Sequence, residues 1–323
     1  MRAAILHAYG AGPVLGERPE PIDAVHLVEV TAAPIVPLDL LCASGTSYFG
    51  QQPLPYVPGV QGIGVVRSSS DVAAGTRVWF ATTAGMRPGD GSLAEFCAVA
   101  TTDLVPIDGE LTDAAAAAIG TSGIAAWMAL TWRARLQPGE RVVVLGASGI
   151  VGQVTTAAAR HLGAARVVAV VRSAAAADAA LGGGATQVVT LADHPDRTTL
   201  SRRLIEAADG PVDVVIDPVF GEPAAAAADA LGPGGRLVNL GGAAGDRTDF
   251  SSATLRGRSI AILGYTNNAI TPAQRAGALG SVLGLASAGE LKVSHVIRPL
   301  TECAEAWAEA GRSGTRVVLD TRA

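Results

Sequence analysis

The feature that most constrains the fold of this chain is a glycine-rich turn near its middle. The segment VVVLGASGIVGQ (142–153) carries Gly146, Gly149 and Gly152 between an apolar run of strand character and a sequence of helix character. Glycines at this spacing allow a tight turn, close approach of a ligand to the backbone, and packing of the helix on the strand. The free N–H groups of a helix N-terminus suit an anion, so the turn predicts a site for the pyrophosphate of a dinucleotide. A tight turn without a ligand is the alternative.

Strand-like and helix-like segments alternate around and after this turn. Apolar runs such as 141–145, 167–171 and 212–217 are separated by alanine-rich segments of helix character. Strands that are apolar along their whole length are typical of a parallel sheet with helices on both faces. We therefore predict an α/β fold with a Rossmann-type, doubly wound parallel sheet over residues 117–264.

The part of the chain before this region has a different pattern. Short β-like runs alternate with turns that contain glycine and proline over residues 1–116, which predicts an irregular, mostly β domain. Residues 265–323 contain one helix-like segment and a closing strand, RVVLD, which is too little for a core of their own. We therefore expect residues 265–323 to return to the first domain, so that the chain forms two domains.

Composition and charge exclude several classes of function. The formal net charge is −5 and there is no basic run, so we expect no nucleic-acid partner. We identify no uncharged apolar segment of about 18 residues and no signal-peptide core, and we therefore expect no membrane partner and a cytoplasmic location. Cys42, Cys97 and Cys303 lie far apart, and the five histidines have no metal-ligand spacing. This pattern predicts neither a disulfide framework nor a metal site.

The end of the second strand of the predicted sheet distinguishes between the two nicotinamide cofactors. An acidic residue about 20 positions after the glycine turn would bind the adenosine ribose diol and repel a 2′-phosphate. Arg172 and Ser173 occupy this place, counted from Gly152. A guanidinium and a hydroxyl group suit a phosphate, so the sequence predicts NADPH as the cofactor. A solvated charge at the strand end is the alternative for Arg172.

With these residues in place, the chain resembles the zinc-independent quinone oxidoreductase (zeta-crystallin-like) branch of the medium-chain dehydrogenase/reductase superfamily. The resemblance extends nearly from end to end. It is carried by the order and spacing of the segments MRAAILHAYG, PLDLLCASGTSYFGQQPLPYVPGVQGIGVV, GDGSLAEFCAV, DVVIDPVFG, LVNLGG and LRGRSIAILGYTNN, together with the glycine turn. It implies a GroES-like, mostly β domain beside a Rossmann domain, with the cofactor in the cleft between them.

The resemblance also implies where zinc would be held in the alcohol dehydrogenases of the superfamily. Their ligands, a Cys, a His and a further Cys, correspond here to Val36, Val60 and the vicinity of Gly123. None of these residues can bind zinc. The Cys-rich structural zinc lobe of those enzymes is also absent from this sequence, so we expect chemistry without a metal.

The resemblance adds cofactor contacts at later strand ends. Leu240, Gly241 and Gly242 would border the nicotinamide ribose, and Leu263 and Tyr265 would border the carboxamide. The remaining predicted contacts belong to the glycine turn and are Ser148, Ile150 and Val151. A lysine and a tyrosine that often hold the 2′-phosphate in the family are replaced here by Ala176 and Leu191, so Arg172 and Ser173 would hold it alone. Asp217 ends a strand on the cofactor side, where capping of the following turn is an equal alternative.

Without a metal, transfer of a hydride from nicotinamide C4 requires an acceptor that delocalises the new negative charge. Quinones and α,β-unsaturated carbonyl compounds are such acceptors, whereas an unactivated ketone needs a zinc ion or a well-placed acid. By resemblance, Thr46, Ser47 and Tyr48 lie in the loop that faces the nicotinamide. We favour Tyr48 as the hydrogen-bond donor, with packing under the PLPYVPG loop as the alternative.

Together these observations predict an NADPH-dependent, zinc-independent reductase of a quinone or an α,β-unsaturated carbonyl compound. A 2-enoyl reductase that acts on a biosynthetic intermediate would share the fold and the cofactor turn. A non-catalytic NADPH-binding sensor or structural protein is a third alternative, because Val36 replaces a polar asparagine of the family. The apolar strand SIAILG (259–264) would leave an uncovered sheet edge, and its pairing with a second copy predicts a homodimer.

Overall fold

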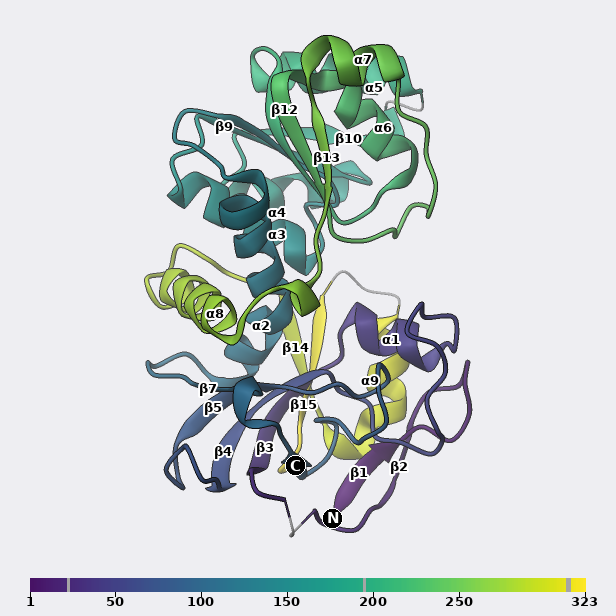
Figure 1. The fold of residues 1–323 in the computed structure, drawn as a ribbon, viewed down its shortest axis with the longest axis vertical. Helices are drawn as coiled ribbons and strands as arrows, with labels where there is room; N and C mark the ends of the chain where they lie inside the picture. The colour runs from purple at the N-terminus through teal and green to yellow at the C-terminus, as the bar shows by residue number, and fades with distance from the viewer. Residues whose placement is uncertain (22–23, 194–195, 312–314) are drawn as a thin grey trace. The chain divides into compact units, whose positions relative to one another are not determined.

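The structure, a computed structural model, divides the chain into two compact units (Figure 1). The first unit consists of Met1–Gly120 and Val293–Ala323, and the second unit is Thr121–Lys292. The residues described are 1–21, 24–193, 196–311 and 315–323. Each unit contains its own sheet and its own buried apolar core.

The second unit is built on a six-stranded parallel sheet with the order β10-β9-β8-β11-β12-β13. Its strands are β8 (Arg141–Val144), β9 (Arg166–Val171), β10 (Gln187–Thr190), β11 (Val212–Asp217), β12 (Leu231–Asn239) and β13 (Ala261–Gly264). The chain begins at β8 in the middle, proceeds outward to β10, and returns to β11 on the other side of β8. This is the predicted Rossmann topology, and its ligands bind where the direction of winding reverses, at the carboxyl ends of β8 and β11.

Helices connect the strands of the second unit or follow its last strand. They are α3 (Ile150–His161), α4 (Ala177–Gly182), α5 (Arg197–Ala208), α6 (Gly221–Ala230), α7 (Ser252–Arg258) and α8 (Pro272–Ser287), with the short helices η3 (Ala174–Ala176), η4 (Leu191–Asp193) and η5 (Asn267–Ala269). Of these, η5 and α8 follow the last strand, β13. The alanine-rich sequence of α6 has a structural use, because residues 224–228 are all buried between α5 and the sheet. Small side chains allow this close approach.

The first unit is mostly β, as predicted. Its main sheet has the order β14-β15-β3-β4-β5-β7, and β6 also pairs with β3. The elements are β1 (Arg2–Ile5), β2 (Val14–Glu17), β3 (Leu27–Pro34), α1 (Pro37–Ala43), β4 (Gln61–Ser68), β5 (Arg77–Ala81), β6 (Phe96–Ala98), η1 (Thr101–Asp103), β7 (Leu104–Pro106), β14 (His295–Pro299), η6 (Leu300–Glu302), α9 (Cys303–Ala310) and β15 (Arg316–Asp320). The closing strand β15 lies antiparallel to β3, so the end of the chain completes this sheet.

The boundary near residue 265 differs from the prediction. Residues 265–292 belong to the second unit, and only Val293–Ala323 completes the first. The side-chain amide of Asn267 donates to the Thr121 carbonyl oxygen at 3.1 Å, and α8 packs on α3 with Leu279 and Val282 buried. The sequence pattern identified α8 as a helix, but an isolated helical pattern does not indicate which core the helix covers.

One helical stretch, Asp113–Ala134, is long and apolar enough to cross a membrane by length and composition, which corrects our expectation that no such segment exists. Buried residues make up 72% of its most apolar window, as in the core helix of a globular protein. It consists of α2 (Asp113–Met128) and the π-helical η2 (Ala129–Ala134). The stretch bends at Gly120, where φ is +24° and a Cβ would lie 1.9 Å from Oε1 of Gln61. Only glycine fits this bend.

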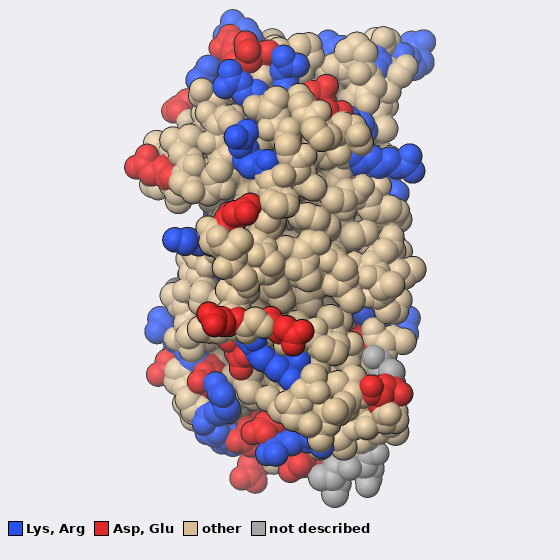
Figure 2. All heavy atoms as spheres, turned by 90° about the vertical axis from the view of Figure 1, so that its left-hand side faces the viewer, with Lys and Arg blue, Asp and Glu red and all other residues tan. Residues whose placement is uncertain are grey.

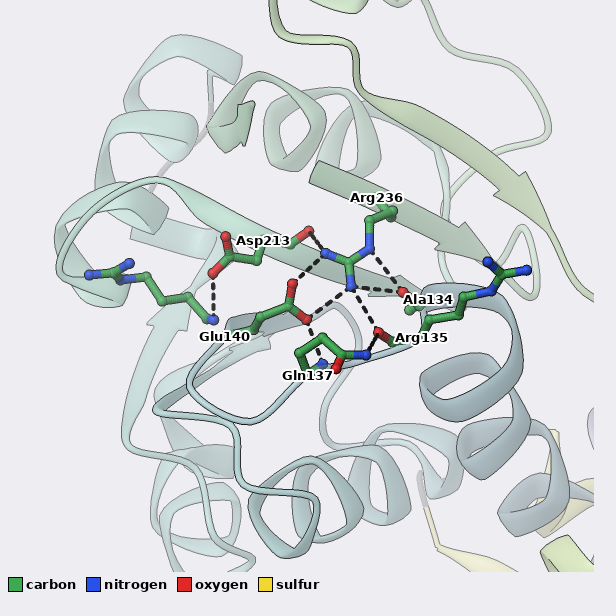
Figure 3. Close-up of polar contacts among 7 residues, drawn as sticks. Ala134, Arg135, Gln137, Glu140, Asp213 and Arg236 are labelled. Carbon is green, nitrogen blue, oxygen red and sulfur yellow. Dashed lines mark hydrogen bonds and ion pairs between the residues drawn. The ribbon is translucent and has the colours of Figure 1, made fainter. Parts of the chain in front are cut away.

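Arg236 organises the amino-terminal edge of the second unit's sheet (Figure 3). Its guanidinium donates to both carboxylate oxygens of Glu140, at 2.7 and 2.9 Å. It also donates to the carbonyl oxygens of Ala134, at 2.7 and 2.9 Å, and Asp213, at 3.3 Å. The arginine of β12 therefore connects the end of η2, the turn before β8 and the beginning of β11. Both charged side chains are about one-fifth exposed.

Candidate cofactor and active site

The glycine turn joins β8 to α3. Gly146 has φ of +60°, a left-handed value that favours glycine, and Gly149 is the N-cap of α3. A Cβ on Gly152 would lie 2.5 Å from both the Cα of Ala147 and the carbonyl oxygen of Gly146. These neighbours are backbone atoms, which cannot rotate away. The close packing predicted for this glycine is therefore present.

The first turn of α3 can hold an anion. The first N–H groups of a helix have no acceptor within the helix and carry its positive dipole end. Ile150 and Val151 are the first two residues of α3, and Ser148 precedes its N-cap Gly149. The glycine turn is held by a hydrogen bond from the Gly149 N–H to the Gly146 carbonyl oxygen at 3.0 Å. The side-chain amide of Gln153 donates to the Ser148 carbonyl oxygen at 2.8 Å. The backbone donors are thus pre-organised.

The other predicted cofactor residues of the second unit lie at the same edge of its sheet. Arg172 and Ser173 follow β9, the segment 240–242 follows β12, and Tyr265 follows β13, where Leu263 is the penultimate strand residue. The carboxyl ends of parallel strands share one edge, and the glycine turn of β8 lies in its middle. The fold therefore brings residues that are up to 119 positions apart (265 − 146) to one side of the sheet.

Arg172 and Ser173 are both exposed at the end of β9. Within the part of the chain that the structure describes, the Arg172 guanidinium forms no ion pair. Ser173 is the N-cap of η3, but its hydroxyl makes no capping hydrogen bond. Their polar groups are therefore available to a ligand.

Tyr265 is held by its neighbours. Its hydroxyl donates to Oδ1 of Asn267 at 2.7 Å, and its ring lies edge-on to Trp132 with 6.2 Å between the ring centroids. Burial raises the pKa of Tyr265, although the charge of Arg275 acts in the opposite direction. The hydroxyl therefore stays neutral in neutral solution and is already used within the protein, so Tyr265 offers a ligand its ring rather than a proton.

Of the three predicted donors in the first unit, Tyr48 presents the most accessible hydroxyl. Its side chain is 78% exposed and its ring contacts Phe49, with 4.2 Å between the centroids. Ser47 is buried and accepts a hydrogen bond from the Phe49 N–H, and Thr46 shares one with Ser44. Tyr48 does not pack under the neighbouring loop. Tyr56, which belongs to that loop, is 3% exposed and lies in the apolar core of the first unit, in agreement with a structural role.

The positions that correspond to zinc ligands in alcohol dehydrogenases do not fit a metal. Val36 and Val60 are both buried, and their N–H groups donate to the carboxylate of Asp39 at 2.8 and 2.9 Å. Burial raises the pKa of Asp39 to about 6, and backbone hydrogen bonds and the charge of Arg316 oppose the rise. Among the residues with described positions, no group of three or more His, Cys, Asp or Glu side chains could hold a metal ion.

Figure 2 shows one face of the molecule, with acidic and basic side chains interspersed and separated by uncharged surface. This face carries no continuous basic patch of the kind that binds a nucleic-acid backbone. The distribution agrees with the net charge of −5.

Two protein families match the two parts of the chain. Residues 23–109 match the alcohol dehydrogenase GroES-like domain, and residues 151–283 match the zinc-binding dehydrogenase family. The quinone oxidoreductase of Rattus norvegicus is 31% identical over 250 residues, which cover 75% of this chain and 73% of the rat protein. The chain belongs to the quinone oxidoreductase branch of the medium-chain dehydrogenase/reductase superfamily. It is an oxidoreductase with a fold that binds a nicotinamide dinucleotide and a small-molecule substrate.

Solved structures support the same fold. A structure described as an NAD-dependent alcohol dehydrogenase has a TM-score of 0.85 at 25% identity and covers 99% of both chains. The native structure of a mycobacterial quinone oxidoreductase has a TM-score of 0.88 at 23% identity, again covering 99% of both chains. Because proteins of this fold differ in cofactor, the choice between NADH and NADPH depends on individual residues.

Proposed function

We propose that this chain is an NADPH-dependent, zinc-independent reductase that transfers a hydride to a quinone or an α,β-unsaturated carbonyl compound. The main support for the cofactor is the exposed guanidinium of Arg172 at the end of β9, where an NADH-dependent relative would carry an acid. The main support for the substrate class is the absence of ligand atoms at Val36 and Val60, because conjugated acceptors need no metal.

In this proposal the second unit binds the cofactor through three groups of residues. The glycine turn and the first N–H groups of α3 hold the pyrophosphate, and Arg172 with Ser173 holds the 2′-phosphate. Leu240, Gly241 and Gly242 border the nicotinamide ribose, and Leu263 with Tyr265 borders the carboxamide. Bound NADPH supplies a hydride from C4 of its nicotinamide ring.

The protein's part in the reaction is positioning and a hydrogen bond. A quinone or an enone distributes the negative charge of the accepted hydride over a conjugated system that ends at an oxygen. The exposed hydroxyl of Tyr48 donates to this oxygen. Hydride transfer to a quinone gives a stabilised hydroquinone anion, which can take its proton from water. The reduction of an enone is therefore expected to depend more on Tyr48 than the reduction of a quinone.

Arg172→Ala tests the cofactor assignment. Loss of charged hydrogen bonds to the 2′-phosphate is expected to weaken NADPH binding by about 1.5–3 kcal/mol, which is about tenfold to a hundredfold in Kd. The Kd of NADH should not change, because NADH has no 2′-phosphate. Arg202→Ala, which removes a guanidinium that is 73% exposed on α5, is the matched control and should alter neither constant. Equal weakening of both cofactors would remove Arg172 from the site.

Tyr48→Phe tests the hydrogen-bond donor. We expect kcat with an enone to fall by at least about a hundredfold, within the usual range for a positioned proton donor, and kcat with a quinone to fall less. Tyr56→Phe is the matched control, because the buried Tyr56 hydroxyl has no hydrogen-bond partner among the described residues. The control should retain activity and unfold at the same or a higher temperature. Unchanged enone reduction by Tyr48→Phe would refute the assignment.

We further propose a homodimer formed through β13. This strand is one edge of the six-stranded sheet, and Ala261, Ile262 and Leu263 remain partly exposed. Unpaired backbone groups on an apolar edge favour pairing with a second copy. Sedimentation equilibrium should give twice the chain mass of 32.4 kDa. A mass equal to that of one chain at micromolar concentration would contradict the dimer.

A cytoplasmic location is part of the proposal. Cys42, Cys97 and Cys303 are free and buried. Reduced thiols are usual in the cytoplasm, where disulfides are rare.

A further inference from the structure

The carboxyl group of Asp217 is fully buried at the carboxyl end of β11. One of its oxygens accepts hydrogen bonds from the N–H groups of Val219 at 3.0 Å and Phe220 at 2.7 Å. The other accepts a hydrogen bond from the side-chain amide of Asn239 at 3.0 Å. Burial raises the pKa of Asp217, and these three hydrogen bonds act against the rise. Because its acceptors are occupied within the protein, the group is suited to holding its neighbours in place.

Asn239 ends the adjacent strand β12 and is the partner of Asp217 in the parallel register. Its side-chain Nδ2 also donates to the carbonyl oxygen of Gly241 at 2.8 Å, and its backbone carbonyl oxygen accepts from the Tyr265 N–H at 2.9 Å. The Leu240 N–H donates to the Asp217 carbonyl oxygen at 2.8 Å. The two side chains therefore join the end of β11 and the turn after it to the end of β12 and the loop after it, and the backbone of Asn239 extends this connection to the end of β13.

The turn that Asp217 caps has an unfavourable backbone conformation. Phe220 has φ of 57° and ψ of −156°, which a residue with a large side chain rarely adopts. The Val219 carbonyl oxygen accepts from the Ala244 N–H at 2.6 Å. A Cβ on Gly146 would lie 2.8 Å from Cγ1 of Val219. The capped turn therefore lies against the glycine turn on one side and is hydrogen-bonded to the loop after β12 on the other.

We propose that Asp217 and Asn239 are positioning residues of the dinucleotide site. Their hydrogen bonds hold the backbone of residues 240–242 at a fixed position relative to the glycine turn. The nicotinamide half and the pyrophosphate of the cofactor are then bound at a fixed separation. This inference rests on the proposed function, which assigns residues 240–242 to the nicotinamide ribose. Misplacement of a reacting group by about 1 Å lowers the reaction rate by about a hundredfold. We therefore expect substitution of Asp217 or Asn239 to weaken binding of the nicotinamide half of the cofactor and to lower kcat.

The test compares the binding of NADPH with that of adenosine 2′,5′-bisphosphate, which contains only the adenosine half of the cofactor. Asn239→Ala removes the bond to the Gly241 carbonyl oxygen, and Asp217→Asn places an amide donor against the donor of Asn239. We expect both variants to bind NADPH at least about tenfold more weakly and to have a lower kcat. The Kd of the bisphosphate should stay at the wild-type value.

Asp213→Asn is the matched control. Asp213 lies in the same strand at its amino-terminal end, where its carboxylate accepts the Arg141 N–H at 2.8 Å. An asparagine oxygen can still accept this bond, so the control should keep both affinities and kcat. Equal weakening of NADPH and the bisphosphate in both site variants, or unchanged NADPH binding and kcat, would overturn the positioning role. Wild-type protein that binds neither NADPH nor the bisphosphate would overturn the proposed function as well, which distinguishes the two failures.

Discussion

Replacement of Gly152 by alanine is expected to weaken dinucleotide binding by at least about a hundredfold. The new Cβ would lie 2.5 Å from the Cα of Ala147 and from the carbonyl oxygen of Gly146. Since both neighbours are backbone atoms, the turn must open or α3 must move away from β8. Either change removes the helix N–H groups from the pyrophosphate. We also expect the free energy of unfolding to fall by about 1–3 kcal/mol, as for other overpacked sites.

A glycine-to-alanine substitution at another site distinguishes the loss of dinucleotide binding expected for Gly152→Ala from a general effect of adding a methyl group. Gly284 is exposed in α8, and a Cβ there meets no atom within 4 Å. Gly284→Ala should stabilise the protein by about 0.5–1 kcal/mol through helix propensity and leave the Kd of NADPH unchanged. Isothermal titration and thermal unfolding of both variants provide the comparison. Wild-type affinity in Gly152→Ala would show that the turn is not the pyrophosphate site.

The second large effect is expected from Arg236→Ala, which should lower the free energy of unfolding by about 2–4 kcal/mol. Removal of one partner of a buried ion pair costs about 3–5 kcal/mol, and the one-fifth exposure of both side chains reduces this value. Loss of Arg236 leaves Glu140 with only the Gln137 N–H as an identified donor, and it frees the carbonyl oxygens of Ala134 and Asp213. Urea unfolding measures the difference.

The pH dependence of this variant has a defined sign. Burial raises the pKa of Glu140, but hydrogen bonds from Arg236 and Gln137 outweigh it, and the net pKa lies below the usual 4.5. The ion pair therefore stabilises the folded state above pH 4.5, and its contribution is lost as the pH falls through the lowered pKa. The difference in the free energy of unfolding between wild type and Arg236→Ala should therefore become smaller as the pH falls below 4.5. Arg202 forms an exposed ion pair with Glu206 on the same helix, and Arg202→Ala should change the free energy of unfolding by less than about 0.5 kcal/mol.

The sequence predicted the features of the fold and the candidate site that are encoded locally. The glycine spacing of 146, 149 and 152 describes one strand–turn–helix unit, so its geometry could be derived without the rest of the chain. The position of Arg172 follows from counting 20 residues from Gly152, through one helix and one strand. The helical stretch 113–134 was harder, because its apolar composition is shared by membrane helices and core helices, and only tertiary packing distinguishes them.

Other features could not be derived because they depend on contacts between distant segments. The sequence places Asp217 at the end of a strand, but its side chain accepts a hydrogen bond from Asn239, which is 22 positions away and ends the neighbouring strand. The role of Asn239 was not predicted, and its only local signal is that it is a polar residue at the end of an otherwise apolar strand. The placement of residues 265–292 in the second unit likewise depends on the packing of α8 on α3.

The most direct test of the proposed chemistry is the oxidation of NADPH by 1,4-benzoquinone and by an enone, followed through the near-ultraviolet absorbance of the reduced cofactor. The purified protein is first dialysed against a chelator and analysed for metal, and NADH serves as the control cofactor. We predict turnover by metal-free protein, with NADPH preferred over NADH. Turnover that disappears on removal of stoichiometric zinc and returns when zinc is restored would contradict the proposed mechanism, as would NADPH binding without oxidation by either acceptor.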